Sequence, residues 1–258
     1  MVPVTSGVKY YVRAYAKDAA GNYVYSNEVN VPDVCPSATV QDGNGNSYTT
    51  VAIGSQCWTT HSLHATKYAD GTDLTLGSPT SGNLYSSTVG YYYTPYPSNA
   101  PTGDAAARIQ IWGYMYNWAA ATRGVSGDNV QGICPNGWHI PSMADWNTLD
   151  NYVKSTYGCN GGSAQAMSSV NTWTSTGTST CMPGYDAAHT NNKSGFNAYP
   201  AGYYNASGYT DAANSVRFWA SDNNYYTRLV YNNKDFLSNN TATNLQTNYA
   251  FSVRCVKN

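Results

Sequence analysis

Six cysteines constrain the fold more than any other feature of this sequence, because they are spread over most of the chain. They are Cys35, Cys57, Cys134, Cys159, Cys181 and Cys255. Six cysteines allow fifteen pairings, and the alternative to full pairing is that some are free buried thiols. We predict the bonds Cys35–Cys57, Cys159–Cys181 and Cys134–Cys255. The first two would close modest loops, worth about 3 kcal/mol each, and the third would tie the chain's end to its middle for about 4–5 kcal/mol.

The composition favours an extracellular binding protein. The chain carries 25 Tyr and 7 Trp, and charged residues make up 10% of it, against about 25% in an ordinary soluble domain. An even number of cysteines in such a chain indicates an oxidising compartment. A formal net charge of -1 argues against nucleic acid or an anionic membrane as a partner. No apolar run approaches the ~20 residues of a membrane span, so no membrane insertion is expected.

The stretch from Phe218 to Asn258 looks like a displayed surface. Between FWASDNNYYTR and YAFSVRCVKN it is rich in Asn, Thr and Tyr and has no Gly or Pro. Such a segment buries too little apolar surface to offset its ordering entropy, so a scaffold must hold it. Core-like residues bracket it, Trp219 on one side and Val253 on the other. Tyr with Asn, Ser and Thr is the composition of a paratope, and the alternative is an ordinary solvated loop.

Residues 1–33 are predicted to form two strands, KYYVRAYA and YVYSNEVNV, joined by a DAAGN turn with Gly21 at its tip. Two strands cannot make an independent domain. The segment resembles the last hairpin of a fibronectin type III or related immunoglobulin-like sandwich, with Tyr10 at the tyrosine-corner position. Because Met1 leads directly into strand-like sequence with no secretion signal, we expect a piece of a longer chain.

Residues 34–258 are expected to form one domain that starts with a β-hairpin. Its strands are predicted at Ala38–Gln41 and Ser47–Ile53, and residues 70–105 and 159–195 are predicted to be rich in loops. GFNAYPAGYY and SVRFWASD are predicted strands of a final sheet, with AFSVRCVKN as the terminal strand.

Two helices are predicted in this domain. A short one is expected near Tyr116–Thr122. The clearer signal follows Ser142, a good N-cap, with Asp145 three residues later as an acidic variant of the capping box. A buried stripe is expected on this helix at Trp146, Leu149 and Val153.

Several motifs occur in an order that resembles a known family. They are DGNGNSYTTVAIGSQCW, YADGT, WGYMYNWAAAT, CPNGWHIPSMADW, GFNAYPAGYY, FWASD and SVRCVKN. Over nearly all of residues 37–257 the chain resembles the Fibrobacter succinogenes major paralogous domain family, which is related to the formylglycine-generating-enzyme branch of the C-type lectin fold. The resemblance implies an α+β fold with much irregular loop structure and a loop-built binding face on the final strands. It also supports the Cys134–Cys255 bond, since both cysteines lie inside family motifs.

The residues give little support to an enzyme, and we expect none. Formylglycine-generating enzymes bind copper through a pair of C-terminal cysteines, whereas Cys255 is the only cysteine after Cys181. Glycosidases usually need two carboxylates, yet Glu28 is the only Glu and the Asp residues lie in turn-like sequences. No HExxH, GxSxG or P-loop motif is present.

Metal binding has weak signals. His61 and His64 are three residues apart, a spacing common by chance, and His139 is expected to pack and bond the backbone. Motifs of calcium-dependent sugar binding are absent, so we expect no cofactor. A structural calcium ion on loop Asp, Asn and carbonyl oxygens is left open as an alternative.

The resemblance also points to a mechanism of variation. Relatives of this fold include the variable proteins of diversity-generating retroelements, in which an error-prone reverse transcriptase mutates template adenines. Codons of the AAY type then give Asn when unchanged, and Tyr, Ser, Asp, His or Thr when mutated. The segment from Asn223 to Tyr249 has that mixture and lies between FW and SVRC, where such systems place their variable region.

We therefore expect a C-type-lectin-fold domain with a candidate variable region at 218–258, on a virion or a bacterial cell surface. It would bind a protein or glycan receptor on a cell. Leu229, Phe236 and Phe251 are expected to face inward as supports. The residues expected to be displayed are Asn223, Asn224, Tyr226, Arg228, Tyr231, Asn233, Asp235, Ser238, Asn240, Thr241, Asn244 and Gln246. The alternatives are a fixed-specificity adhesin or glycan-binding module, and a constant family member whose terminal loop has drifted.

Overall fold

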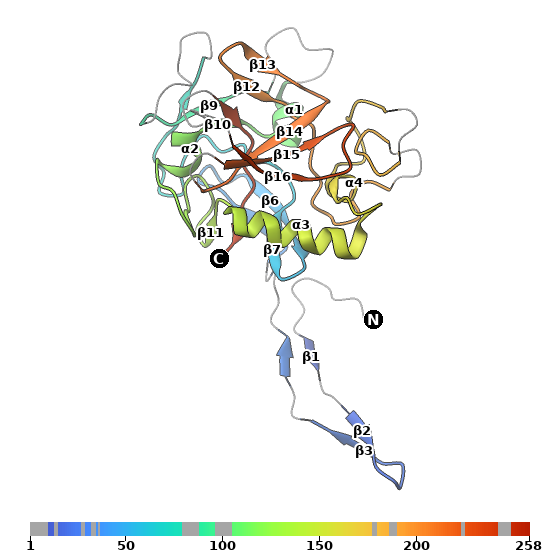
Figure 1. Cartoon of the computed structure of the whole chain (residues 1–258). Coiled ribbons are helices and arrows are strands. Elements are labelled where there is room, and N and C mark those ends of the chain that lie inside the picture. Colours follow the sequence, from blue (N-terminus) through green and yellow to red (C-terminus); the bar gives the residue numbers. More distant parts are fainter. Residues whose placement is uncertain are drawn as a thin grey trace.

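Short strands outnumber helices in this mixed α+β chain (Figure 1). The computed structural model describes residues 10–12, 15–26, 29–31, 35, 37–78, 88–95, 105–176, 180–185, 190–222, 225–241 and 249–258. Near the N-terminus, β1 (Tyr10–Val12) pairs antiparallel with β4 (Val29–Val31), and β2 (Tyr15–Lys17) pairs with β3 (Tyr23–Tyr25). These strands project away from the rest of the chain (Figure 1).

Three sheets make up the body of the protein. In order across each sheet, the largest contains β13 (Gly208–Thr210), β12 (Tyr203–Asn205), β17 (Ala250–Phe251), β10 (Met115–Asn117), β9 (Tyr91–Tyr93) and β8 (Thr75–Leu76). The second contains β11 (Trp138–His139), β18 (Val256–Lys257), β7 (Gln56–Thr59), β6 (Ser47–Ile53) and β5 (Thr39–Gln41). The third contains β14 (Ser215–Trp219), β15 (Tyr225–Val230) and β16 (Leu237–Thr241).

The predicted hairpin after residue 34 is present as β5 and β6, with Asp42 in its turn. Asp42 Oδ1 accepts the backbone N–H groups of Asn44 and Asn46 at 2.8 and 3.0 Å. The carboxylate is therefore used to build the turn, as expected for Asp in this sequence context.

Helix α3 (Met143–Tyr157) is the helix that the sequence predicted most clearly. Ser142 caps it and Asp145 completes the capping box. Trp146, Leu149 and Val153 are fully buried. The ring of Trp146 packs against an aromatic cluster drawn from the sheets, with Trp58 at 4.8 Å and Phe218 at 5.5 Å between ring centroids. This cluster belongs to one of the two groups of buried hydrophobic residues that form the core.

Other elements differ from the predictions. The short helix is α2 (Trp118–Thr122), which starts after the N-cap Asn117, so Tyr116 belongs to strand β10. Helices α1 (Ala105–Trp112) and α4 (Ala164–Met167) lie in or beside stretches predicted to be loops.

The prediction of one terminal strand was wrong. AFSVRCVKN forms two short strands, β17 and β18, in different sheets. The other predicted strands of a single final sheet are divided too, with β12 in the largest sheet and β14 in the third. The residues between β17 and β18 bond to other elements, so the chain passes from one sheet to the next.

Candidate functional site

The polar C-terminal segment leaves the scaffold and returns to it at the same place. At its start, the Trp219 N–H donates to the Ser252 carbonyl at 3.2 Å, and at its end the Ser252 N–H donates to the Arg217 carbonyl at 3.1 Å. Phe218 and Ser252 form a parallel β-bridge. The base of the segment between is therefore closed by backbone hydrogen bonds, and the rings of Trp219 and Phe251 pack there as well, 4.4 Å apart.

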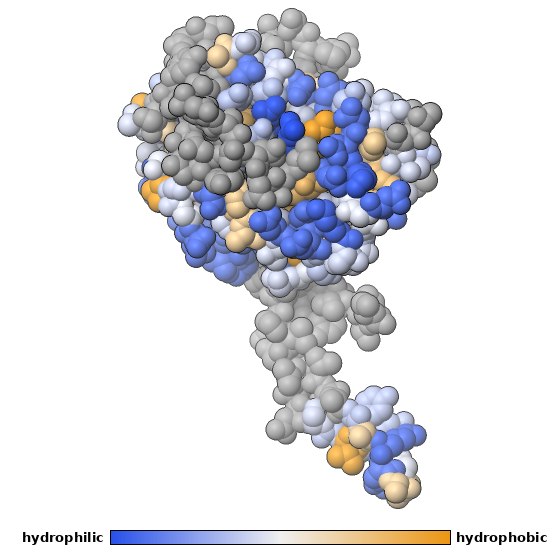
Figure 2. Space-filling view, viewed as in Figure 1, coloured by the Kyte–Doolittle hydropathy of each residue, from blue (hydrophilic) through white to orange (hydrophobic). Residues whose placement is uncertain are grey.

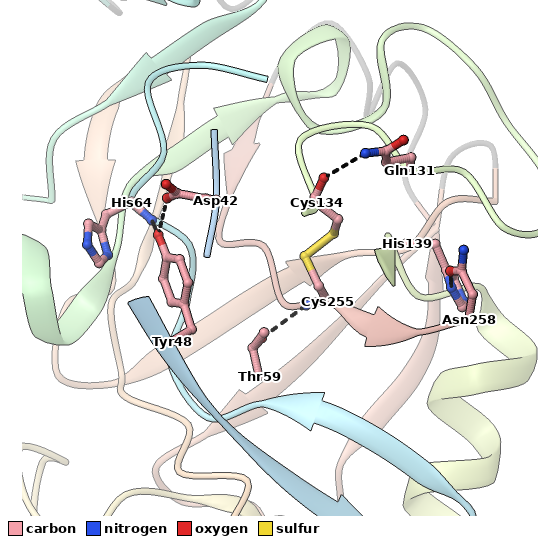
Figure 3. The surroundings of a disulfide bond; sticks show 9 residues. All are labelled: Asp42, Tyr48, Thr59, His64, Gln131, Cys134, His139, Cys255 and Asn258. Atoms are coloured by element: carbon pink, nitrogen blue, oxygen red, sulfur yellow. Dashed lines mark hydrogen bonds between the residues drawn. A yellow bond between two sulfur atoms is a disulfide. The ribbon is translucent and has the colours of Figure 1, made fainter. Parts of the chain in front are cut away.

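The returning end is fixed to the middle of the chain. The Cys255 carbonyl accepts the Thr59 N–H at 3.1 Å, and the Val253 carbonyl accepts the Leu63 N–H at 3.0 Å. Cys255 forms a disulfide bond with Cys134 (Figure 3). The other two predicted bonds, Cys35–Cys57 and Cys159–Cys181, are also present, so the predicted pairing is confirmed.

Arg254 is a buried cation that joins three segments. Its Nη1 donates to the carbonyls of Thr59 and Phe196 at 2.6 and 2.9 Å, and its Nη2 to the carbonyl of Asn197 at 2.8 Å. Its guanidinium carbon lies 4.6 Å from the centroid of the Phe196 ring. Burial lowers the pKa of Arg254 to about 9. Carbonyl dipoles thus take the place of a counter-ion at this position.

Strand β15 is the middle strand of the third sheet, and its faces differ. Thr227 and Leu229 are fully buried on the core side. Phe236 and Phe251 are buried as well, so the three predicted inward supports, Leu229 included, are confirmed as buried residues.

Tyr226 was predicted to be displayed, and the structure places it in the core. Its side chain is 8% exposed, and its ring lies 5.0 Å from the ring of Phe251. It pairs across the sheet with the buried Trp219. Tyr226 therefore supports the surface instead of forming it.

The structure describes some of the other residues that were predicted to be displayed. Arg228, Tyr231, Asn233 and Asp235 are half-buried. Asn233 Oδ1 accepts the Asp235 N–H at 2.9 Å, and Asp235 pairs with Lys234 at 3.2 Å. Ser238, Asn240 and Thr241 lie on β16, and nothing is described of their side chains. The other predicted positions lie outside the described residues: Asn223, Asn224, Asn244 and Gln246.

Sequence reasoning missed Arg217, which lies on this face just before the candidate variable region. Its guanidinium carbon is 3.4 Å from the centroid of the Tyr203 ring and 5.3 Å from that of Tyr226. Its cross-strand partner is Arg228. The alternation of SVRFW, with Arg217 between the core residues Val216 and Phe218, was the available signal. Figure 2 shows hydrophilic residues together with a hydrophobic one in the region of β14 and β15.

A second candidate site, after the C-terminal face, is a hollow of about 440 Å³ lined by no residue of the C-terminal stretch; we call it the second hollow. The residues that line it are Asn44, Asn46, His64, Thr66, Ala106, Ile109, Gln110 and Tyr114. His64 is 7% exposed, and its Nδ1 is buried with no hydrogen-bond partner among the described residues. Its backbone N–H donates to Tyr48 Oη at 2.9 Å, and Tyr48 donates to Asp42 at 2.6 Å (Figure 3). Burial lowers the pKa of His64, which favours a neutral ring with one free hydrogen-bonding nitrogen.

The histidines bond differently from each other. His61 Nδ1 lies 2.9 Å from Thr60 Oγ1, and its ring stacks on Tyr199. His139 was expected to bond the backbone, but its ring contacts side chains, with Nδ1 2.7 Å from Asn258 Oδ1 and Nε2 3.3 Å from Asp145 Oδ2. The cause is Asp145, whose capping role brings its carboxylate to the ring.

The described residues contain neither a cluster of metal ligands nor a membrane-spanning helix. Within the described part of the chain, no group of three or more His, Cys, Asp or Glu could hold a metal ion. Among the helices that the structure describes, none is long and apolar enough to cross a membrane.

The fold and the site define a class: a disulfide-bonded α+β domain with a polar C-terminal sheet closed at its base. The chain belongs to the Fibrobacter succinogenes major domain family, whose model matches residues 51–257. The match starts within β6, later than the resemblance from residue 37. No curated protein and no solved structure matched the chain.

Proposed function

We propose that this is a non-enzymatic, extracellular protein that binds a cell-surface receptor through its C-terminal face, and that a retroelement diversifies this face. The closure of the segment by backbone bonds between Arg217, Trp219 and Ser252 carries the proposal. Because these bonds use no side-chain atoms, side chains between them can change without removing the closure. The three disulfides favour an oxidising, extracellular location, on a virion or a bacterial surface.

The finer fold assignment belongs to the same proposal. A C-type-lectin-like fold would place its variable segment between two constant strands, as β14 and β17 are arranged here. The paired strands β1–β4 would be the last hairpin of a fibronectin type III or immunoglobulin-like sandwich.

DNA around the encoding gene tests the retroelement. We expect a near-copy of the bases for residues 218–258 beside a reverse transcriptase gene, with mismatches at adenines of the copy. The mismatched codons should encode half-buried positions such as Tyr231 and should spare Leu229 and Phe236. Absence of a copy, or mismatches that fall equally on buried positions, would contradict diversification.

The alternative is a fixed-specificity adhesin or glycan-binding module, and the second hollow favours it. Its walls combine amide, hydroxyl and imidazole groups with the ring of Tyr114, a mixture suited to a sugar. This alternative predicts binding on a polysaccharide array that survives replacement of residues 239–248 and is lost in His64→Ala. Loss of binding on replacing 239–248, with His64→Ala unaffected, would favour the C-terminal face.

A further inference from the structure

Two arginines face each other on the C-terminal sheet, and neither has an acidic partner among the residues that the structure describes. Arg217 on β14 pairs directly with Arg228 on β15, and cross-strand partners point to the same face. Like charges in this arrangement are destabilising. The Nε atoms of both are buried and have no hydrogen-bond partner within the described part of the chain. Neither arginine forms an ion pair with a residue that the structure describes.

The neighbouring carboxylates are already engaged. From Phe218 to the C-terminus the sequence has two acidic residues, Asp222 and Asp235. Asp222 accepts the Met143 N–H at the start of α3, and Asp235 pairs with Lys234. The face therefore has an excess of positive charge at Arg217 and Arg228.

Aromatic rings hold this charge in place. The Arg217 guanidinium lies over Tyr203, which limits its freedom before any ligand binds. Tyr249 is half-buried beside Tyr203, with 6.1 Å between ring centroids. A planar cation and an aromatic face are thus adjacent on one surface.

We propose that Arg217 and Arg228 together bind the acidic group of a charged sugar residue, whose ring packs on Tyr249. Guanidinium groups bind carboxylate and sulfate through paired hydrogen bonds, and the sugar's C–H face suits an aromatic ring. This inference rests on the proposed ligand-binding role of the face. Arg217 precedes the candidate variable region, so it would be the same in every variant. Arg228 lies inside the region, so it would be present only in some variants.

Calorimetric titration with defined oligosaccharides tests the proposal. The probes are an oligogalacturonide, its neutral methyl ester and a heparin-derived oligosaccharide. We expect binding of at least one acidic probe, and binding of the ester at least tenfold weaker. Arg217→Gln and Arg228→Gln should each weaken acidic binding about tenfold or more. Lys234→Gln makes the same charge change on a residue already paired with Asp235, and should change affinity less than about threefold.

Thermal unfolding of each variant separates binding from folding. Because each substitution relieves repulsion between the arginines, we expect the melting temperature of Arg228→Gln to equal or exceed that of the parent. A variant that does not fold, or a melting temperature several degrees lower, would assign the pair a structural role and overturn the proposal.

The remaining outcomes also decide the question. Equal binding of the acidic probes and the ester, equal loss in Lys234→Gln, or binding of polyglutamate without either acidic oligosaccharide would overturn it. The DNA test stays independent, because a template copy with adenine mismatches would support a diversified face even if no acidic sugar binds.

Discussion

Two parts of the C-terminal stretch are held by opposite means. Residues 252–255 are fixed by backbone bonds, a buried guanidinium and a disulfide, and all four are buried. The side chains of Arg228, Tyr231 and Asn233 are half-buried. The backbone of Tyr231 bonds Asn214 and Gly184, whereas the described side-chain hydrogen bond at Asn233 is local. The contrast indicates that stability is concentrated where the segment closes. The exchangeable surface would then contribute little to folding.

Removing the Cys134–Cys255 bond should have the largest effect. The double variant Cys134→Ser, Cys255→Ser releases a loop with a sequence separation of 121 residues and should lose about 4–5 kcal/mol of unfolding free energy. The matched control is Cys159→Ser, Cys181→Ser, with a separation of 22, for which about 3 kcal/mol is expected. Urea unfolding under oxidising conditions measures both. A larger loss of unfolding free energy in the Cys159→Ser, Cys181→Ser control would contradict the idea that stability is concentrated where the C-terminal segment closes.

Arg254→Met should be next. The substitution leaves the carbonyls of Thr59, Phe196 and Asn197 without their hydrogen-bond donor, which lowers the unfolding free energy. Part of this loss is offset because the variant no longer buries a charge. We expect a net loss of about 2–4 kcal/mol. Arg123→Met is the control, since Arg123 makes an exposed ion pair with Asp70 and should cost about 1 kcal/mol or less. Equal losses would show that the buried guanidinium is no anchor.

Two tyrosines in the same stretch sharpen the comparison. Tyr226→Ala removes a ring packed against Phe251 and should cost about 2–4 kcal/mol. Tyr231→Ala changes the same residue type at a half-buried position and should cost about 1 kcal/mol or less. Chemical unfolding of the two variants side by side checks this. Similar losses of unfolding free energy in the two variants would show that Tyr226 and Tyr231 contribute equally to the fold. Tyr226 would then not be a buried support distinct from the surface residue Tyr231.

The scaffold should also respond to acid through His61. Burial, and then the nearby charge of Arg254, lower the pKa of His61 to about 4. A His with a depressed pKa contributes stability above its unfolded value of about 6.5, and this is lost as pH falls through about 6.5 to 4. Between pH 7 and pH 4.5, His61→Asn should therefore lose less stability than the parent, by about 1–2 kcal/mol.

His139 provides a control of opposite sign. Burial alone would lower the pKa of His139, but its hydrogen bonds to the Asp145 carboxylate and the Asn258 side-chain oxygen outweigh it and raise the pKa. The contribution of His139 to the stability of the fold is complete below about pH 6.5, and it is lost as pH rises through the folded-state pKa. His139→Asn should therefore be more destabilising at pH 5 than at pH 8. The same pH response in both variants would contradict the assignments.

The features that depend on residues close together in the sequence were predicted correctly. The cap at Ser142 and Asp145 and the buried stripe behind it depend on residues within one helix, and both are present. Leu229 was likewise expected to face inward as a support, and it is buried. The cysteine pairing was predicted as well, with family motifs supporting Cys134–Cys255.

Long-range packing set the limits of prediction. Tyr226 is buried because its ring packs on that of Phe251, which is far from it in the sequence. AFSVRCVKN has the composition of one strand, but the bonds of Val253 and Cys255 to Leu63 and Thr59 divide it between two sheets. The facing arginines were missed because cross-strand register was not predicted.

Replacing the surface itself should have the smallest effect on stability. A triple variant with Tyr231→Ser, Asn233→Ser and Asp235→Ser loses one local hydrogen bond and one exposed ion pair, each worth little. We expect a total cost of about 1 kcal/mol, less than Tyr226→Ala alone, and an unchanged circular dichroism spectrum. A cooperative loss of several kcal/mol would mean that the surface holds the fold together. A retained fold would mean that backbone closure at Ser252 is sufficient to carry different side chains, as a diversified binding face requires.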